Sequence, residues 1–273
     1  MGRFARSWEI FKASWRVLRS RKELAVFPLL SGLASLVVAA SFLTPALFTI
    51  RASDTDSPTA ASYLLFVGFY LVTAYVTIFF NAALISQASV ALAGGDPSVA
   101  AGLRSAGSNW ARILPWALLS ATVSLILRAI EERLGFLGQI VIGLVGMAWQ
   151  LVTYLVLPIL VLEGRGTKDS IKRSSEMFKR TWGENVVGNA GIGVITFLAV
   201  LPAAALIALG VAAGGATLLG CVVVAVLWLI VVAIASAALS GIYQTALYRY
   251  AASGEVAPAF AGADFGHAFR TKR

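Results

Sequence analysis

The sequence has few charged residues, with Asp, Glu, Lys and Arg making up 13% of its 273 residues. Soluble domains average about 25% charged and roughly 45–50% apolar residues. Here 59% of the residues are hydrophobic and the mean hydropathy is +0.83. So few charges cannot cover a soluble domain of this length, and so apolar a chain cannot remain disordered in water. The composition therefore predicts an integral membrane protein.

Cysteine and histidine are nearly absent, with one residue of each in the chain. A disulfide framework or a thiolate metal site within the chain is thereby excluded. The centres of the long apolar runs carry no Asp, Glu, Lys, Arg or His. Ion-coupled transporters and intramembrane enzymes usually keep such residues within their spans, and general acid–base catalysis needs them. We therefore expect no enzymatic activity, no cofactor and no metal.

Six apolar runs are long enough to cross a bilayer, which takes about 20 residues of helix. The second run is too long for a perpendicular crossing, so it must tilt or continue beyond the membrane. The sequence predicts an all-α, polytopic membrane protein with six transmembrane helices. Their approximate bounds are residues 26–50, 61–93, 113–130, 136–162, 186–213 and 217–250.

Basic residues are distributed unevenly between the connections of these runs. Of the 22 Lys and Arg residues, seven lie in residues 1–25, two in 94–112, six in 163–183 and four from residue 249 onward. The positive-inside rule then predicts that both termini and these two loops are cytoplasmic. The net charge of +9 suits anionic headgroups. Nucleic acid is not expected, because no recognised binding module accompanies the charge.

On the opposite side, a cluster of charges, Arg128, Glu131, Glu132 and Arg133, ends the third run. We expect these four side chains to pair with one another at the headgroup level, in preference to the alternative that they form a gate or a substrate site.

An amphipathic pattern precedes each odd-numbered run. In residues 4–18 aromatic and aliphatic residues recur at intervals of four and three, with basic residues between them, which predicts a helix with one apolar face. Such a helix lies in a membrane interface. The same spacing recurs in residues 99–110 and 171–182. The predicted membrane-interface residues are Phe4, Trp8, Phe11, Trp15, Leu103, Trp110, Phe178 and Trp182.

The first and third of these segments also share letters. Residues 6–15 and 173–182 are identical at six of ten positions. Each even-numbered run ends at a glycine, namely Gly94, Gly164 or Gly254. We interpret the chain as one membrane domain, residues 1–273, built from three repeats, because internal repeats specify architecture. The alternative is convergence, since basic amphipathic helices before spans are common. Each repeat is an interfacial helix and a transmembrane hairpin, at about residues 1–95, 96–166 and 167–254, followed by a cytoplasmic tail, 255–273.

Uncharged amides are the remaining polar groups inside the runs. Asn81, Gln150 and Gln244 each lie in the second helix of a predicted repeat. Intramembrane amides commonly join helices, at about 0.6–2 kcal/mol each. A second interpretation is a polar seam that lines a cavity for a neutral solute or a lipid headgroup. The sequence leaves both interpretations open.

Both ends of the chain resemble a known family. The start at residues 6–15, the Phe27-Pro28-Leu29-Leu30 entry to the first run and the exit at residues 248–254 are similar to bacterial six-span membrane proteins catalogued as a domain of unknown function. They resemble more distantly the membrane region of bacterial glycerophosphodiester phosphodiesterases, whose catalytic domain has no counterpart in this sequence. The resemblance implies six spans and a bacterial cytoplasmic (inner) membrane location, and it brings no activity.

Three functions fit these observations. The first is a non-catalytic membrane protein that interacts with membrane lipids, especially anionic headgroups, through its cytoplasmic interfacial helices. The second is a channel or facilitator for a neutral or amphipathic solute, including an oligomeric pore. The third is an accessory subunit of a membrane enzyme or exporter, with another membrane protein as its partner.

Overall fold

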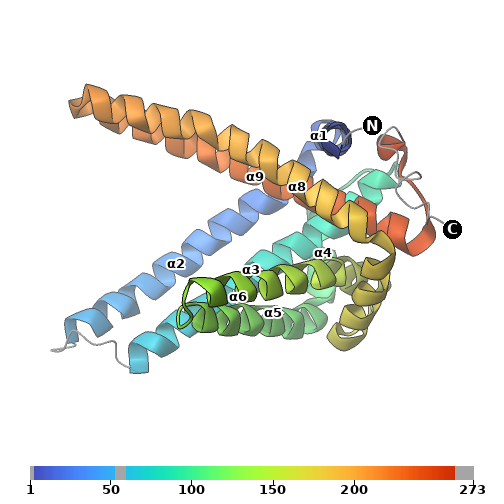
Figure 1. Ribbon diagram of the computed structural model, residues 1–273, viewed down its shortest axis with the longest axis horizontal. Coiled ribbons are helices and arrows are strands. Elements are labelled where there is room, and N and C mark those ends of the chain that lie inside the picture. The colour runs from blue at the N-terminus through green and yellow to red at the C-terminus, as the bar shows by residue number, and fades with distance from the viewer. Residues whose placement is uncertain (1–2, 53–59, 262–273) are drawn as a thin grey trace. The chain divides into compact units, whose positions relative to one another are not determined.

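The computed structural model describes residues 3–52 and 60–261, and the side chains of residues 8–47, 60–179 and 192–261. These residues form helices joined by short turns, with no strand among them (Figure 1). Six helices are long and apolar enough to cross a membrane. The predicted all-α, six-span fold class is therefore confirmed.

The membrane-length helices lie close to the predicted runs. They are α2 (Val26–Ala52), α3 (Ala60–Leu92), α5 (Trp110–Glu131), α6 (Phe136–Thr153), α8 (Thr167–Ala213) and α9 (Gly215–Ser253). Two amphipathic helices precede the first and second hairpins, α1 (Arg3–Ser20) and α4 (Val99–Ser108). The remaining elements are short: η1 (Lys22–Ala25), α7 (Val156–Pro158), η2 (Ile159–Glu163) and η3 (Pro258–Phe260).

The third amphipathic segment is not a separate helix. It forms the beginning of α8, which has 47 residues. At 1.5 Å per residue such a helix is about 70 Å long, more than twice the roughly 30 Å of a bilayer's hydrocarbon core. In the second repeat, Asn109 leaves helical geometry, with φ −101° and ψ 8°, and separates α4 from α5. No such break separates the amphipathic part of α8 from its apolar part.

The fourth span is interrupted before Pro158. The helix α6 ends at Thr153, and α7 and the π-helical turn η2 complete the span. Proline has no N–H, so the hydrogen bond that would close the preceding helical turn cannot form. The break frees backbone carbonyls near the end of α6 that need other donors.

The chain forms two compact units. The first unit comprises Met1–Ala25, Ala88–Pro97 and Lys179–Arg273, and the second comprises Val26–Gln87 and Ser98–Phe178. In the first unit α1 contacts α9 and η3, and in the second α5 packs against α6 as an antiparallel hairpin (Figure 1).

In both units the buried core lies toward one end of the spans rather than at their middle. In the second unit residues 82–87 of α3 and 155–161 after α6 are buried. In the first unit most of residues 238–248 of α9 are buried. Large apolar residues in the middle of the spans, such as Leu36, Val72 and Leu144, are exposed. Apolar surface of this extent indicates contact with lipid.

Candidate functional site

Helix α1 packs against its own unit through small and aliphatic side chains. Ile10, Ala13, Val17 and Leu18 are buried, with Ile10 only 1% exposed. Successive residues in a helix are 100° apart, so these positions share one side of α1. Apart from the adjoining η1, the main contacts of α1 are with α9 and η3, so this side faces those two elements. The aromatic residues of α1 are therefore not what holds the helix to the protein.

The predicted aromatic residues form a second face of α1. Trp8 and Phe11 stack with ring centroids 5.4 Å apart, and Phe11 and Trp15 stack at 6.2 Å. Trp8 is 51% exposed and Trp15 is 44% exposed, whereas Phe11 is half-buried. The exposed cations Lys12, Arg16 and Arg19 lie on the remaining side, next to this aromatic row. We name Trp8, Phe11 and Trp15 the aromatic row, and Lys12, Arg16 and Arg19 the basic row.

The beginning of α8 has the same division of faces. Ser170, Ser174 and Met177 are buried at intervals of four and three residues, and Met177 is the sequence counterpart of Ile10. Lys168, Lys172 and Lys179 are exposed on another side. Phe178 is half-buried, like its counterpart Phe11. Where the side chains of both segments are described, at residues 8–12 and 175–179, the same side of the helix is buried.

The other predicted interface residues have different environments. Trp110 is 57% exposed at the start of α5, and Leu103 on α4 is half-buried. The side chains of Phe4 and Trp182 lie outside the described residues. Of the eight predicted residues, Trp8, Trp15 and Trp110 are thus exposed aromatic groups.

A buried polar contact positions α4 against α3. The Ser98 N–H donates to Gln87 Oε1 at 2.8 Å, and Gln87 Nε2 donates to Ser86 Oγ at 3.0 Å. Gly102 lies so close to Gln87 and Phe27 that there is no room for a side chain. A Cβ at this position would lie 2.5 Å from Phe27 Cζ and 2.9 Å from Gln87 Cγ. The Gln87 side chain therefore links α3 to the start of α4.

Three glycines end the even-numbered spans in the left-handed conformation, as the sequence predicts. Gly94, Gly164 and Gly254 have φ of 85°, 65° and 72°. This conformation is costly for residues with a Cβ, so glycine ends these helices without strain.

A carboxylate paired with arginine lies close to each of these glycines. Asp96 pairs with Arg21. Glu255 lies 3.3 Å from Arg249 Nη2, and Glu163 lies 3.6 Å from Arg173 Nε while also pairing with Arg165. The carboxylates offset part of the local positive charge. In the basic row Lys12 also pairs with a carboxylate, Glu9 Oε1 at 2.6 Å, whereas Arg16 and Arg19 form no ion pair within the described residues.

Ser174 is a structural residue that the sequence did not single out. Its Oγ donates to the carbonyl oxygen of Val152 at 2.6 Å. Val152 lies just before the break in the fourth span, so the hydroxyl supplies a donor to backbone freed there. The one sequence feature that marks Ser174 is its place in residues 173–182, the segment that is similar to residues 6–15.

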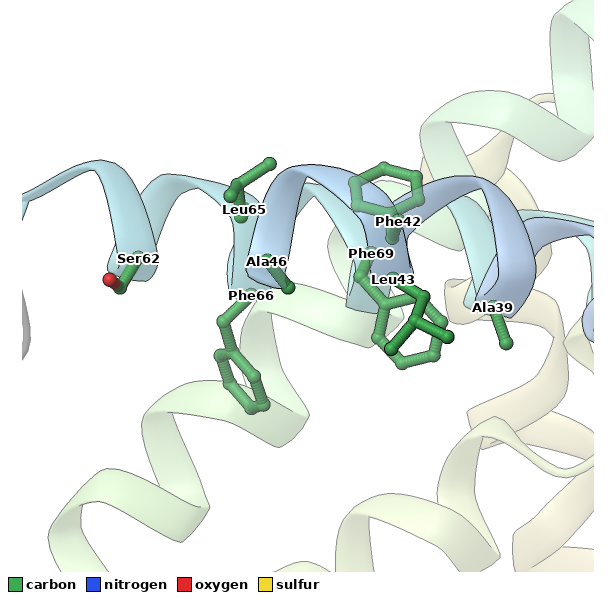
Figure 2. A pocket seen from close by; sticks show the side chains of 8 residues that line it. All are labelled: Ala39, Phe42, Leu43, Ala46, Ser62, Leu65, Phe66 and Phe69. Atoms are coloured by element: carbon green, nitrogen blue, oxygen red, sulfur yellow. The ribbon is translucent and has the colours of Figure 1, made fainter. Parts of the chain in front are cut away.

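An apolar groove lies between α2 and α3 in the second unit. It has a volume of about 300 Å³ and is lined by side chains of both helices (Figure 2). Phe42 and Phe69 meet edge to face across it, with centroids 5.7 Å apart. Its lining offers little polar chemistry, so the groove suits hydrocarbon.

A second cleft, of about 410 Å³, is bounded by α3, α5 and α6. Its polar lining includes Tyr70, Ser124 and Gln150. Asn81, on α3, does not line this cleft, and Gln244 belongs to the other unit. Of the three amides predicted to line a cavity, the structure thus places Gln150 in a cleft.

The prediction that the charges at the end of α5 pair with one another is wrong. Within the described residues none of Arg128, Glu131, Glu132 and Arg133 forms an ion pair. The helix ends at Glu131, so Glu132 and Arg133 follow it in a turn and lose helical spacing. Exposed pairs gain little free energy, which leaves such groups free to separate. Arg128 and Glu131 instead line the second cleft.

A comparison with known families assigns the chain. Residues 60–258, from α3 to the start of η3, match a family of unknown function, DUF6159. The chain belongs to this family. The match to DUF6159 includes the exit at residues 248–254 but not α1, which carries the aromatic row. No curated protein and no solved structure matches the chain significantly.

Proposed function

We propose that this DUF6159 protein is a non-catalytic membrane protein that binds anionic lipid headgroups through its amphipathic helices. The observation that carries the proposal is the division of α1 into three faces. The buried face that includes Ile10 holds the helix to the protein, while the basic row and the two tryptophans of the aromatic row stay exposed. A helix with this arrangement can lie in the interface with its rings among the acyl chains and its cations at the phosphates.

The proposal places these helices at the cytoplasmic surface of a bacterial inner membrane. Most of the 22 Lys and Arg residues belong to the termini and the loops before the third and fifth spans, which supports a cytoplasmic orientation. The negative charge of that leaflet attracts each nearby Lys or Arg by about 1 kcal/mol. Tryptophan prefers the interface because its ring is apolar and its N–H is polar.

A conduit for a neutral or amphipathic solute is a second candidate. It is supported by Gln150, which lines a cleft of about 410 Å³. The charged residues that share this lining, Arg128 and Glu131, belong to the end of the span rather than its middle. A site for an amphiphile fits this lining better than a path across the membrane.

Spin labels on the intact protein in lipid nanodiscs test the orientation of α1. Cys221→Ser removes the single native thiol, and cysteines are then placed at Trp8, Trp15, Glu9 or Arg16. We expect labels at positions 8 and 15 to collide more with oxygen, which concentrates in acyl chains. Labels at 9 and 16, on the other side of the helix, collide more with a water-soluble nickel chelate. Equal nickel accessibility at all four positions contradicts the proposal.

Bound-lipid analysis tests the role of charge. Lys12→Gln, Arg16→Gln and Arg19→Gln, made together, remove the basic row. In nanodiscs of phosphatidylcholine and phosphatidylglycerol, we expect the triple variant to retain less phosphatidylglycerol after delipidation than the unaltered protein. Arg133→Gln, in the turn that follows α5, removes one basic residue outside the basic row and serves as the control. We expect it to leave the enrichment of phosphatidylglycerol unchanged. Equal enrichment in the triple variant contradicts electrostatic recognition.

A further inference from the structure

The cleft between α3, α5 and α6 carries charges of both signs. Arg128 and Glu131 are three residues apart on α5, so their side chains leave the helix on one side. Both line the cleft, and neither forms an ion pair within the described residues. An unpaired cation and an unpaired anion about one helical turn apart offer separate partners for a zwitterion.

The remaining lining extends away from these charges along the hairpin. On α6 the lining residues run from Ile142 to Gln150, which is about 12 Å of helix. Leu127, Met147 and Trp149 supply apolar surface, and Gln150 supplies an amide near the far end of α6. A ligand that fits the cleft is therefore elongated, with a charged head and an apolar body.

The position of the charges on α5 matches the depth of a lipid headgroup. α5 has 22 residues, about 33 Å, which is close to the hydrocarbon thickness of about 30 Å. Arg128 and Glu131 belong to its last turn, where long charged side chains reach the headgroup region. A lipid from the adjacent leaflet can reach this site without moving its head into the hydrocarbon.

We propose that this cleft binds a zwitterionic phospholipid that carries a primary amine, of the phosphatidylethanolamine type. The Arg128 guanidinium binds the phosphate through its forked N–H donors, and the Glu131 carboxylate accepts hydrogen bonds from the ammonium. An acyl chain of this phospholipid lies against the apolar side chains of Leu127 and Trp149. This site is separate from the amphipathic helices of the proposed function, because α1 belongs to the other unit and the cleft contains none of its residues.

Native mass spectrometry of the full chain in mild detergent tests this site with three probes: phosphatidylethanolamine, phosphatidylcholine and phosphatidylglycerol of identical acyl chains. We expect phosphatidylethanolamine to bind more tightly than phosphatidylcholine, by roughly fivefold, because a trimethylated ammonium cannot donate hydrogen bonds to Glu131. Equal binding of these two lipids overturns the proposal. Phosphatidylglycerol also binds the amphipathic helices of the proposed function, so only the part of its binding that Arg128→Gln removes reports on the cleft. If Arg128→Gln lowers phosphatidylglycerol binding more than phosphatidylethanolamine binding, the cleft is an anion site on Arg128 alone and the proposal is overturned.

Two variants that each remove one charge separate the two contacts. Glu131→Gln should lower phosphatidylethanolamine binding to the level of phosphatidylcholine, and Arg128→Gln should weaken both lipids. Glu132→Gln and Arg133→Gln make the same charge changes at neighbouring residues that do not line the cleft. These controls should bind as the unaltered protein does. If Glu132→Gln has the same effect as Glu131→Gln, net charge rather than the cleft governs binding and the proposal fails.

Discussion

Gly102→Ala should destabilise the protein, although alanine favours helices. Alanine gains about 1 kcal/mol over glycine within a helix. At Gly102, however, the new Cβ would lie 2.5 and 2.6 Å from two ring carbons of Phe27 and 2.9 Å from Gln87 Cγ. Phe27 is fully buried and Gln87 is 4% exposed, so neither can withdraw easily. Overpacking of this kind costs about 1–3 kcal/mol, and at contacts this short we expect the cost to exceed the gain.

Gly107→Ala, on the same helix α4, is the matched control. A Cβ at Gly107 meets no atom within 4 Å, so this variant keeps the helical gain without the clash. We expect a net loss of about 1–2 kcal/mol for Gly102→Ala, or a melting temperature about 3–6 °C lower. Intrinsic tryptophan fluorescence of the detergent-solubilised chain during heating measures this difference. A second substitution, Phe27→Leu, should be less harmful in the Gly102→Ala background than alone, as coupled sites require.

The reasoning is refuted if Gly102→Ala melts at or above the temperature of Gly107→Ala. In that case α4 does not approach Phe27 of α2 and Gln87 of α3 as closely as the structure indicates. Absence of coupling with Phe27→Leu leads to the same conclusion.

Three further variants test the other contacts by the same melting assay. Gln87→Leu removes the acceptor for the Ser98 N–H and should cost about 0.5–1.5 kcal/mol, the usual net contribution of a hydrogen bond, because Ser98 is exposed and water can replace the lost partner. Gly254→Ala should lower stability by about 1 kcal/mol because its φ is 72°, whereas Gly220→Ala, on an exposed helical position with no atom in reach, should not. Ile10→Ala should cost about 2–5 kcal/mol by opening a cavity, whereas Trp8→Ala should change the melting temperature in detergent little because Trp8 is exposed.

The repeated features of the chain differ in how strictly the structure preserves them. The glycine exits recur at Gly94, Gly164 and Gly254 with the same left-handed conformation. The amphipathic segments do not recur so closely, since α1 and α4 are separate helices and the third is part of α8. A helix end needs a particular backbone geometry, whereas an amphipathic face needs only a spacing of side chains. The glycines are therefore the stricter feature of the pattern.

The sequence by itself determined the class of protein and the positions of its helices. Spans appear within a few residues of their apolar runs because helix length and hydropathy are local properties, and Gly164 and Gly254 end helices because only glycine adopts their φ without strain. The spacing in α1 likewise predicted an amphipathic helix.

Only the tertiary structure decided which side of that helix meets the protein. The sequence grouped the aromatic residues of α1 as its apolar face, and the contacts of α9 and η3 assign the packing to Ile10, Ala13 and Val17 instead. Likewise, Arg128 lies three residues from Glu131, and Glu131 lies two residues from Arg133, yet in the part of the chain that the structure describes Arg128 and Glu131 form no ion pair and line a cleft formed with α3 and α6. Both results depend on which helices become neighbours. Which helices become neighbours depends on contacts between residues far apart in the chain. The spacing of residues along a single helix carries no information about those contacts.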